Sequence, residues 1–144
     1  LSVEPTDYYV TTTTKDPDGG TTSTKKNGND VITTIDKTWS DGDQTHVELD
    51  HTTNVITVTE TPKGAAALTP ITIAAGQSGT SGKTTATNDL PDGGVELTHA
   101  SAGTSTDGTR STDTTTVDNS GNRTYGKTQV PDAVSVTASD YYVT

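Results

Sequence analysis

Short segments of the chain alternate apolar side chains with threonine or charged residues. Successive side chains of a β-strand point to opposite faces of its sheet, so this alternation predicts strands that bury one face and expose the other. Each predicted strand offers about two apolar side chains to a core. The alternating positions are Val31/Thr33/Ile35, Val47/Leu49, Ile56/Val58, Ile71/Ile73, Val95/Leu97 and Val134/Val136.

Turn-forming residues separate these segments at fairly regular intervals. Asp, Asn and Ser favour the opening of a tight turn, and Gly supplies the positive φ that many turns need. The pattern predicts an all-β fold, an antiparallel hairpin meander that forms a sandwich or a wound sheet, in one domain over residues 1–144. The predicted turns lie at residues 16–20, 27–30, 40–43, 51–54, 89–94, 106–108 and 118–122.

Residues 63–83 interrupt the alternation with a stretch rich in Gly, Ala and Ser. This composition predicts a long connection that holds one short strand, around Pro70-Ile71-Thr72-Ile73. Ala65–Leu68 is the one run that could form a turn of helix. We therefore expect almost no helix in this protein.

Threonine dominates the composition, with 35 of 144 residues, whereas Val, Ile and Leu together number only 22. Threonine is β-branched and fits the pleated surface of a strand. Ordering the backbone of one residue costs about 1–2 kcal/mol, and a fully buried aliphatic side chain returns roughly 1.5–3 kcal/mol. With so thin an apolar layer, we expect an isolated domain to be marginal and to need neighbouring copies, bound cations or both.

The chain is acidic, with a formal net charge of −10 and an isoelectric point near 4.4. This charge argues against binding to nucleic acid or to an anionic membrane, because both need clustered Lys and Arg. No window holds the roughly 18 apolar residues of a membrane-spanning helix. The absence of Cys removes disulfides and thiolate metal sites. The bias towards Thr, Asp, Asn and Gly is typical of secreted proteins, so we expect an extracellular or cell-surface location.

The two ends of the chain carry the same segment. Residues 1–11 align without gaps to residues 134–144, with seven of eleven positions identical and an offset of 133 residues. Either the chain covers one period of a tandem array and the opening of the next, or one subunit carries equivalent strands at both ends. A third interpretation places two similar strands side by side in one sheet. The shared pentamer is Asp7, Tyr8, Tyr9, Val10 and Thr11 in the first copy, and Asp140, Tyr141, Tyr142, Val143 and Thr144 in the second.

An extended terminal strand rich in Tyr, Val and Thr can add to an exposed sheet edge. If one end of a unit pairs where the other end would pair in the next unit, the contact runs head to tail and does not close. The sequence therefore predicts a homopolymer. Its partners are copies of the same chain, and its assembly strands are the two pentamers.

A shorter motif, Asp/Ser-x-x-Gly-x-x-Thr/Ser, recurs inside the chain. Its best copy is Val117-Asp118-Asn119-Ser120-Gly121-Asn122-Arg123-Thr124. This copy resembles the hairpins of the RHS/YD-repeat family, with Val where that family has Tyr, and Thr-rich bacterial or archaeal extracellular surface and filament proteins match similarly. The resemblance covers about a third of the chain. It implies a wound sheet in an extracellular shell or adhesive surface.

Carboxylates gather in several of the predicted turns. A hard cation such as Ca²⁺ needs several oxygen donors within one tight turn. None of the turns completes the EF-hand pattern, and Asx-Gly is also the ordinary composition of a hairpin turn. A structural Ca²⁺ in at least one turn would neutralise crowded like charges. The candidate ligands are Asp16, Asp18, Asp41, Asp43, Asp89, Asp92 and Asp118.

The segment His46–His51 is the cluster closest in composition to a metal or acid/base site. On a strand, His46, Glu48 and Asp50 share one face, but ordinary alternation explains this arrangement without zinc. His99 stands alone in the sequence. The Gly-x-Ser-x-Gly motif of a nucleophilic serine is missing, and we expect no enzyme activity.

Asn122-Arg123-Thr124 is the one glycosylation sequon, which makes Asn122 the candidate glycosylation site. Taken together, the patterns predict an extracellular structural protein. Its β units would assemble head to tail, by terminal strand complementation or as tandem repeats, into a filament or surface layer. The alternative is a calcium-dependent adhesin module that binds glycan or another cell surface.

Overall fold

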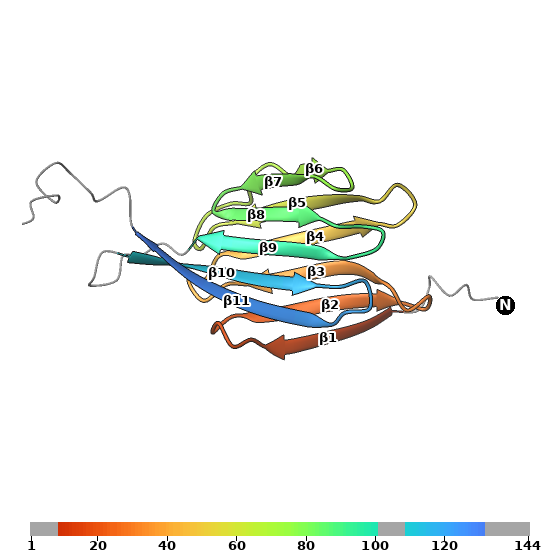
Figure 1. Ribbon diagram of the computed structural model, residues 1–144, viewed down its shortest axis with the longest axis horizontal. Helices are drawn as coiled ribbons and strands as arrows, with labels where there is room; N and C mark the ends of the chain where they lie inside the picture. Colours follow the sequence, from red (N-terminus) through yellow and green to blue (C-terminus); the bar gives the residue numbers. More distant parts are fainter. Residues whose placement is uncertain (1–8, 101–108, 132–144) are drawn as a thin grey trace, which may run out of the picture.

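The computed structural model describes residues 9–100 and 109–131, and these residues form strands and no helix. The strands make two antiparallel sheets that lie one over the other (Figure 1). The all-β prediction is confirmed, and the meander takes the form of a sandwich.

The first sheet follows the chain order, with each strand paired to the next in the sequence. Its strands are β1 (Tyr9–Lys15), β2 (Thr21–Asn27), β3 (Ile32–Thr38), β4 (Gln44–Asp50), β5 (Val55–Thr61) and β6 (Ile71–Ile73). The second sheet starts beside β6 and runs back until β11 lies on the side of β1 (Figure 1). Its strands are β7 (Ser78–Ser81), β8 (Thr84–Asn88), β9 (Val95–Ala100), β10 (Thr109–Val117) and β11 (Arg123–Pro131).

Six of the seven predicted turns connect consecutive strands. In the β1–β2 and β3–β4 turns, Gly19 and Gly42 have φ values of 91° and 93°. Residues with a Cβ rarely adopt this conformation, which explains glycine at these two positions. The seventh predicted turn, at residues 106–108, lies outside the described residues.

Residues 63–83 hold two short strands where the sequence predicted one. The alternation of Ile71 and Ile73 marked β6 correctly, whereas the polar segment of β7 gave no such signal. Because β6 belongs to the first sheet and β7 to the second, this segment carries the chain from one sheet to the other. Ala65–Leu68 forms no helical turn, and its side chains are exposed.

The start of β3 departs from simple alternation. The sequence predicted that Val31, Thr33 and Ile35 point inward. The structure buries Ile32 and Ile35 completely and leaves Val31 and Thr33 partly exposed. The register with β2 shifts at this point, so that Thr33 has no partner of its own. Such a β-bulge inserts one residue and reverses which face the preceding residue occupies.

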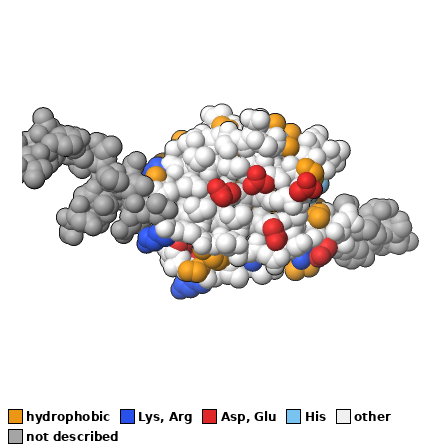
Figure 2. Space-filling view, viewed as in Figure 1, with side chains coloured by type: hydrophobic (Ala, Val, Ile, Leu, Met, Phe, Trp, Pro, Cys, Tyr) orange, Lys and Arg blue, Asp and Glu red, His pale blue; other side chains and the backbone are white. Residues whose placement is uncertain are grey.

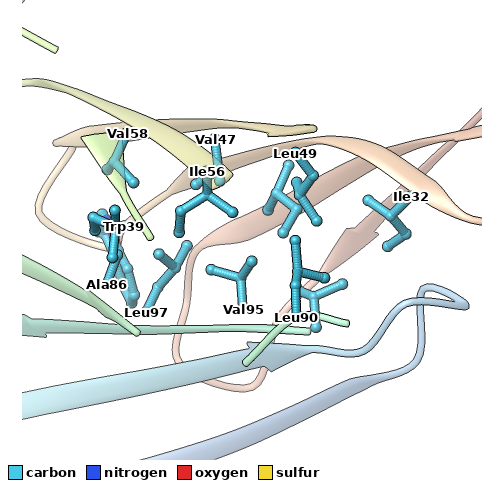
Figure 3. Close-up of a cluster of buried hydrophobic side chains, with 13 residues drawn as sticks. Ile32, Trp39, Val47, Leu49, Ile56, Val58, Ala86, Leu90, Val95 and Leu97 are labelled. Atoms are coloured by element: carbon cyan, nitrogen blue, oxygen red, sulfur yellow. The ribbon is translucent and has the colours of Figure 1, made fainter. Parts of the chain in front are cut away.

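Apolar side chains from both sheets fill the space between them (Figure 3). The predicted inward pairs of β4, β5 and β9 are all buried. Ile73 of β6 is buried too, and Ile71 packs against the same cluster. The buried core residues are Ile32, Ile35, Trp39, Val47, Leu49, Ile56, Val58, Ile73, Ala86, Leu90, Val95, Leu97 and Val117.

The edge strands β1 and β11 lie on the same side of the sandwich and run in the same direction (Figure 1). Arg123, at the start of β11, donates to the carbonyl oxygen of Thr12 in β1 at 2.9 Å. Tyr125 donates through Oη to Asp16, just past the end of β1, at 2.6 Å. The first residue of β1 and the last residue of β11 therefore lie at opposite ends of the long axis.

The first copy of the duplicated pentamer opens β1. Tyr9, Val10 and Thr11 are the first three residues of this strand, and Tyr9 and Val10 are 54% and 62% exposed. All three pair with β2 of the same chain. Asp7, Tyr8 and residues 140–144 lie outside the described residues.

Candidate functional site

The inward rows of apolar side chains end in polar residues at one end of the sandwich. In β5 the row of Ile56 and Val58 continues to Glu60, and in β9 the row ends at His99. Because side chains alternate along a strand, these polar groups point between the sheets. We call this end of the interior the polar seam. It comprises Asp16, Asp18, Lys37, Trp39, Asp41, Asp43, Thr45, Glu60, Thr84, His99, Asp113 and Tyr125, with the exposed Lys83 at its rim.

His99 lies against two of the predicted metal ligands, in a group that we call the histidine cluster (Asp41, Asp43, Lys83 and His99). His99 Nε2 is 2.9 Å from Asp41 Oδ2 and 3.3 Å from Asp43 Oδ2. Lys83 Nζ adds a positive charge 3.0 Å from Asp43 Oδ2. Burial alone would raise the pKa of Asp41, but the Asp43 N–H and the His99 ring hydrogen-bond to its carboxylate and hold that pKa below its usual value.

The second ring nitrogen of His99 faces a hydroxyl and a carboxylate. Nδ1 lies 2.8 Å from Thr84 Oγ1, and that hydroxyl donates to Glu60 Oε2 at 2.9 Å. Thr45 holds the other oxygen of Glu60 at 2.5 Å. The Thr84 hydroxyl, the His99 ring and the Asp41 carboxylate lie in the same order as the nucleophile, base and acid of a catalytic triad. Thr84, however, has no exposed surface that a substrate could reach. These hydrogen bonds hold the buried polar side chains of the two sheets in place.

A second charged group, the lysine cluster (Asp16, Asp18, Lys37 and Tyr125), lies farther along the polar seam. Lys37 Nζ is 2.6 Å from Asp16 Oδ2 and 2.8 Å from Asp18 Oδ2, and these three side chains are between 0% and 4% exposed. The structure thus brings two predicted calcium ligands together around an ammonium group. Burial alone would raise the pKa of Asp16, but hydrogen bonds from Lys37, Thr22 and Tyr125 lower it below its usual value.

Trp39 contacts both clusters. Its ring stacks on His99 with the centroids 4.7 Å apart and an angle of 11° between the planes. Lys37 Nζ lies 4.8 Å from the centroid of the same ring, a cation–π contact. The indole N–H donates to Thr45 Oγ1 at 2.8 Å, so no polar atom of Trp39 is left without a partner. The single Trp of the chain therefore joins the two clusters into one network.

Asp113 of β10 pairs with His99 across the second sheet and points into the polar seam. Its Oδ1 is buried and has no hydrogen-bond partner among the described residues. Burial raises the pKa of this carboxyl above its usual value, and the positive charges of Lys127 and Lys37 only partly oppose the rise. Asp113 therefore takes up a proton at a higher pH than an exposed aspartate.

The remaining predicted turn ligands stay apart. Asp89 and Asp92 are exposed in the β8–β9 turn. Asp118 closes its own turn, because its Oδ1 accepts the backbone N–H groups of Ser120 and Asn122, both at 2.9 Å. Its Oδ2 accepts the side-chain amide of Asn122, the predicted glycosylation site, also at 2.9 Å. Calcium at these turns and a glycan on Asn122 stay predictions.

The predicted zinc candidates His46, Glu48 and Asp50 point outward from β4, as alternation indicated. His46 Nδ1 lies 2.5 Å from Asp36 Oδ1, and Nε2 lies 2.8 Å from Glu48 Oε1. Both ring nitrogens therefore face carboxylates, an arrangement that favours the imidazolium ion. A zinc ligand needs a free ring nitrogen in its neutral form.

We expect His46 to titrate above 6.5. Burial alone would lower the pKa of His46, but hydrogen bonds to Asp36 and Glu48 raise it above the usual 6.5. The two contacts stabilise the fold fully below pH 6.5, and their contribution disappears as the pH rises through the folded-state pKa. NMR titration of the ring protons measures the value, and Asp36→Asn should lower it. A His46 pKa at or below that of exposed histidine would contradict this prediction.

Sequence reasoning missed most of the polar seam. Lys37, Glu60 and His99 are ionisable and were given no inward role, although each continues the phase of a buried apolar row. This alternation was the signal in the sequence from which their burial could have been predicted. Asp41 and Asp43 were singled out as ligands, but nothing in their neighbourhood of the sequence points to His99.

Comparison of the chain with protein-family models, with curated proteins and with solved structures finds no match in any of the three. Within the described ranges, 9–100 and 109–131, no helix has the length and apolar character needed to cross a membrane.

Proposed function

We propose that this chain is a unit of an extracellular structural protein, in which β-sandwich units follow one another end to end in a filament or surface layer. The observation that carries the proposal is the path of the chain, which enters β1 at one end of the long axis and leaves β11 at the other (Figure 1). Residues 134–144 duplicate the segment that leads into β1, so a second unit can begin directly after β11.

The pairing of β1 favours covalent tandem units over exchange of strands between separate chains. β1 pairs with β2 along its whole length, from Tyr9 opposite Asn27 to Lys15 opposite Thr21. Tyr9, Val10 and Thr11 of the chain's own first pentamer therefore occupy the edge of β2. A second copy from a neighbouring molecule could add there only by displacing β1.

The outer surface supports a unit surrounded by water. Uncharged polar groups cover most of the face in Figure 2, and the acidic side chains form separate spots on it. Threonines occupy many of the outward positions, as in β5 with Thr57, Thr59 and Thr61. Such a surface stays solvated along an array and offers little apolar area to a neighbouring sandwich face.

A protein made of four consecutive periods, each with residues 1–133, tests the proposal. Negative-stain electron microscopy should show thin beaded rods, because each unit continues the axis of the one before. The matched control is the single chain of residues 1–144, which should sediment as a monomer. Compact clusters from the four-period protein would count against an end-to-end array.

Binding of a divalent cation at the histidine cluster is a second candidate function. Asp41, Asp43 and His99 place three ligand atoms within 4.8 Å of one another. Asp43 Oδ2 is buried, and the nitrogens near it, Lys83 Nζ at 3.0 Å and His99 Nε2 at 3.3 Å, make no aligned hydrogen bond to it. One imidazole with two carboxylates suits zinc better than calcium, which prefers oxygen ligands only.

Lys83→Met should strengthen zinc binding, because the positive charge of Lys83 lies beside Asp43 and would repel a bound cation. Isothermal titration calorimetry with zinc chloride measures the change. The control is the double variant Lys83→Met with Asp43→Asn, which lacks a ligand and should bind zinc more weakly. Equal affinity in the wild type, the single variant and the double variant would reject the site.

A further inference from the structure

The lysine cluster keeps a primary amine and a carboxyl group in contact and away from water. The side chains of Lys37 and Asp16 have no exposed surface, and Nζ lies 2.6 Å from Oδ2. A buried ion pair loses the hydration of both charges, and neutral groups of similar shape are often more stable in its place. A reaction that removes both charges without moving the side chains would relieve this cost.

We propose that Lys37 and Asp16 condense to an amide, which cross-links β3 to the β1–β2 turn. Nζ forms a bond to Cγ of Asp16, the bond between Cγ and Oδ2 breaks, and Oδ2 leaves as water. Two of the three ammonium protons go to Oδ2, and the third stays on the amide nitrogen. The ion pair thus becomes a neutral amide and one water molecule, with no oxidation or reduction.

Asp18 is placed to move one of these protons. Its Oδ2 lies 2.8 Å from Lys37 Nζ, so it can accept a proton from the nitrogen and pass it to the leaving oxygen. Asp18 also lines a small surface pocket with Pro17 and Tyr125, through which the released water can leave. It serves as the base of the reaction.

The other oxygen of Asp16 is held by hydroxyl groups. Tyr125 donates to Oδ1 at 2.6 Å, and Thr14 donates to it at 3.2 Å. When Nζ adds to Cγ, this oxygen takes up negative charge, and donors already in position stabilise that charge. The corresponding oxygen of Asp18 has a single donor in the described part of the chain, the Gly20 N–H at 2.8 Å. In this geometry Lys37 therefore forms the amide with Asp16 rather than with Asp18.

Proximity and exclusion of water favour both the formation and the survival of the amide. The fold holds the two reacting groups together, so the reaction is intramolecular and its orientation is already set. The rings of Trp39 and Tyr125, with centroids 4.8 and 5.4 Å from Nζ, shield the bond from hydrolysis. The link would close a covalent loop around β2 in a chain that has no Cys for disulfides.

The intact mass of the purified chain, residues 1–144, tests the proposal directly. We expect a mass lower than that of the sequence by one water molecule. Trypsin does not cleave after an acylated lysine, so digestion should give a branched peptide that joins residues 16–25 to residues 27–63. Fragmentation should place the bond on Asp16. An amide on Asp18 would overturn the proposal that Asp16 is the residue linked to Lys37.

Three variants separate the chemistry from the fold. Lys37→Arg keeps the charge and should show the full sequence mass, and Asp18→Asn and Tyr125→Phe should lower the cross-linked fraction. Trp39 fluorescence reports whether each variant is folded. A folded wild-type chain with the full sequence mass, which yields residues 27–37 and 38–63 as separate peptides, overturns the proposal. The result is independent of whether units form arrays.

Discussion

Replacing Lys37 by Met is expected to lower the free energy of unfolding by about 3–5 kcal/mol. The substitution removes the lysine nitrogen, whether it stands in the ion pair or in the proposed amide, and leaves the carboxylates of Asp16 and Asp18 buried without a cation. Met fills a similar volume, so the loss comes mainly from charge. Urea unfolding, followed by the fluorescence of Trp39, measures the change.

The loss in Lys37→Met should depend on pH. Protonation of Asp16 removes uncompensated charge from the variant, so its difference in stability from the wild type should narrow at acid pH, where Asp16 takes up a proton. Lys15→Met is the matched control, because Lys15 is exposed on β1. That change should stay within about 0.5 kcal/mol. A loss in Lys37→Met no larger than in the control would contradict the role of Lys37.

Trp39→Ala is expected to cost about 3–5 kcal/mol, as for other buried aromatic side chains. Trp39 is 2% exposed and fills the junction between the apolar core and the polar seam. Its loss removes the stacking on His99 and the contact with Lys37, and it leaves Thr45 without the indole donor. Thermal unfolding followed by circular dichroism measures the effect, since the variant has no Trp fluorescence.

Leu68→Ala is the control for this truncation, because Leu68 is 38% exposed in the connection between β5 and β6. We expect its unfolding temperature to change little. If Trp39→Ala and Leu68→Ala shift the unfolding temperature equally, Trp39 does not hold the seam together.

The alternation of side chains, together with the turn residues between the strands, made most of the sheets predictable. The pairs in β4, β5 and β9 were placed correctly because an uninterrupted strand keeps its phase. The bulge at Thr33 broke that phase, and a bulge depends on pairing with another strand rather than on local sequence. β7 was missed because Gly79 and its polar neighbours carry no apolar signal.

The polar seam was predicted only in part, for a different physical reason. Asp41 and Asp43 attracted attention as carboxylates in one turn, but their partner His99 follows 58 positions after Asp41. Asp16 meets Lys37 from 21 positions away. A polar residue at an inward position can be buried only when another group hydrogen-bonds to it or pairs with its charge. When that partner is distant in the sequence, a single sequence does not show which residue it is.

We infer that consecutive units continue in line along the long axis. Spin labels can test it cleanly, because the chain has no Cys of its own. We would place Thr53→Cys, in the exposed β4–β5 turn, in both units of a protein with two consecutive periods. Double electron–electron resonance then measures the distance between equivalent positions.

The strands set the expected scale, since the nine residues of β10 span about 30 Å. Units that follow one another end to end should give a single narrow distance of at least this length. A narrow distance well below it would mean that the units lie side by side, and it would contradict the account.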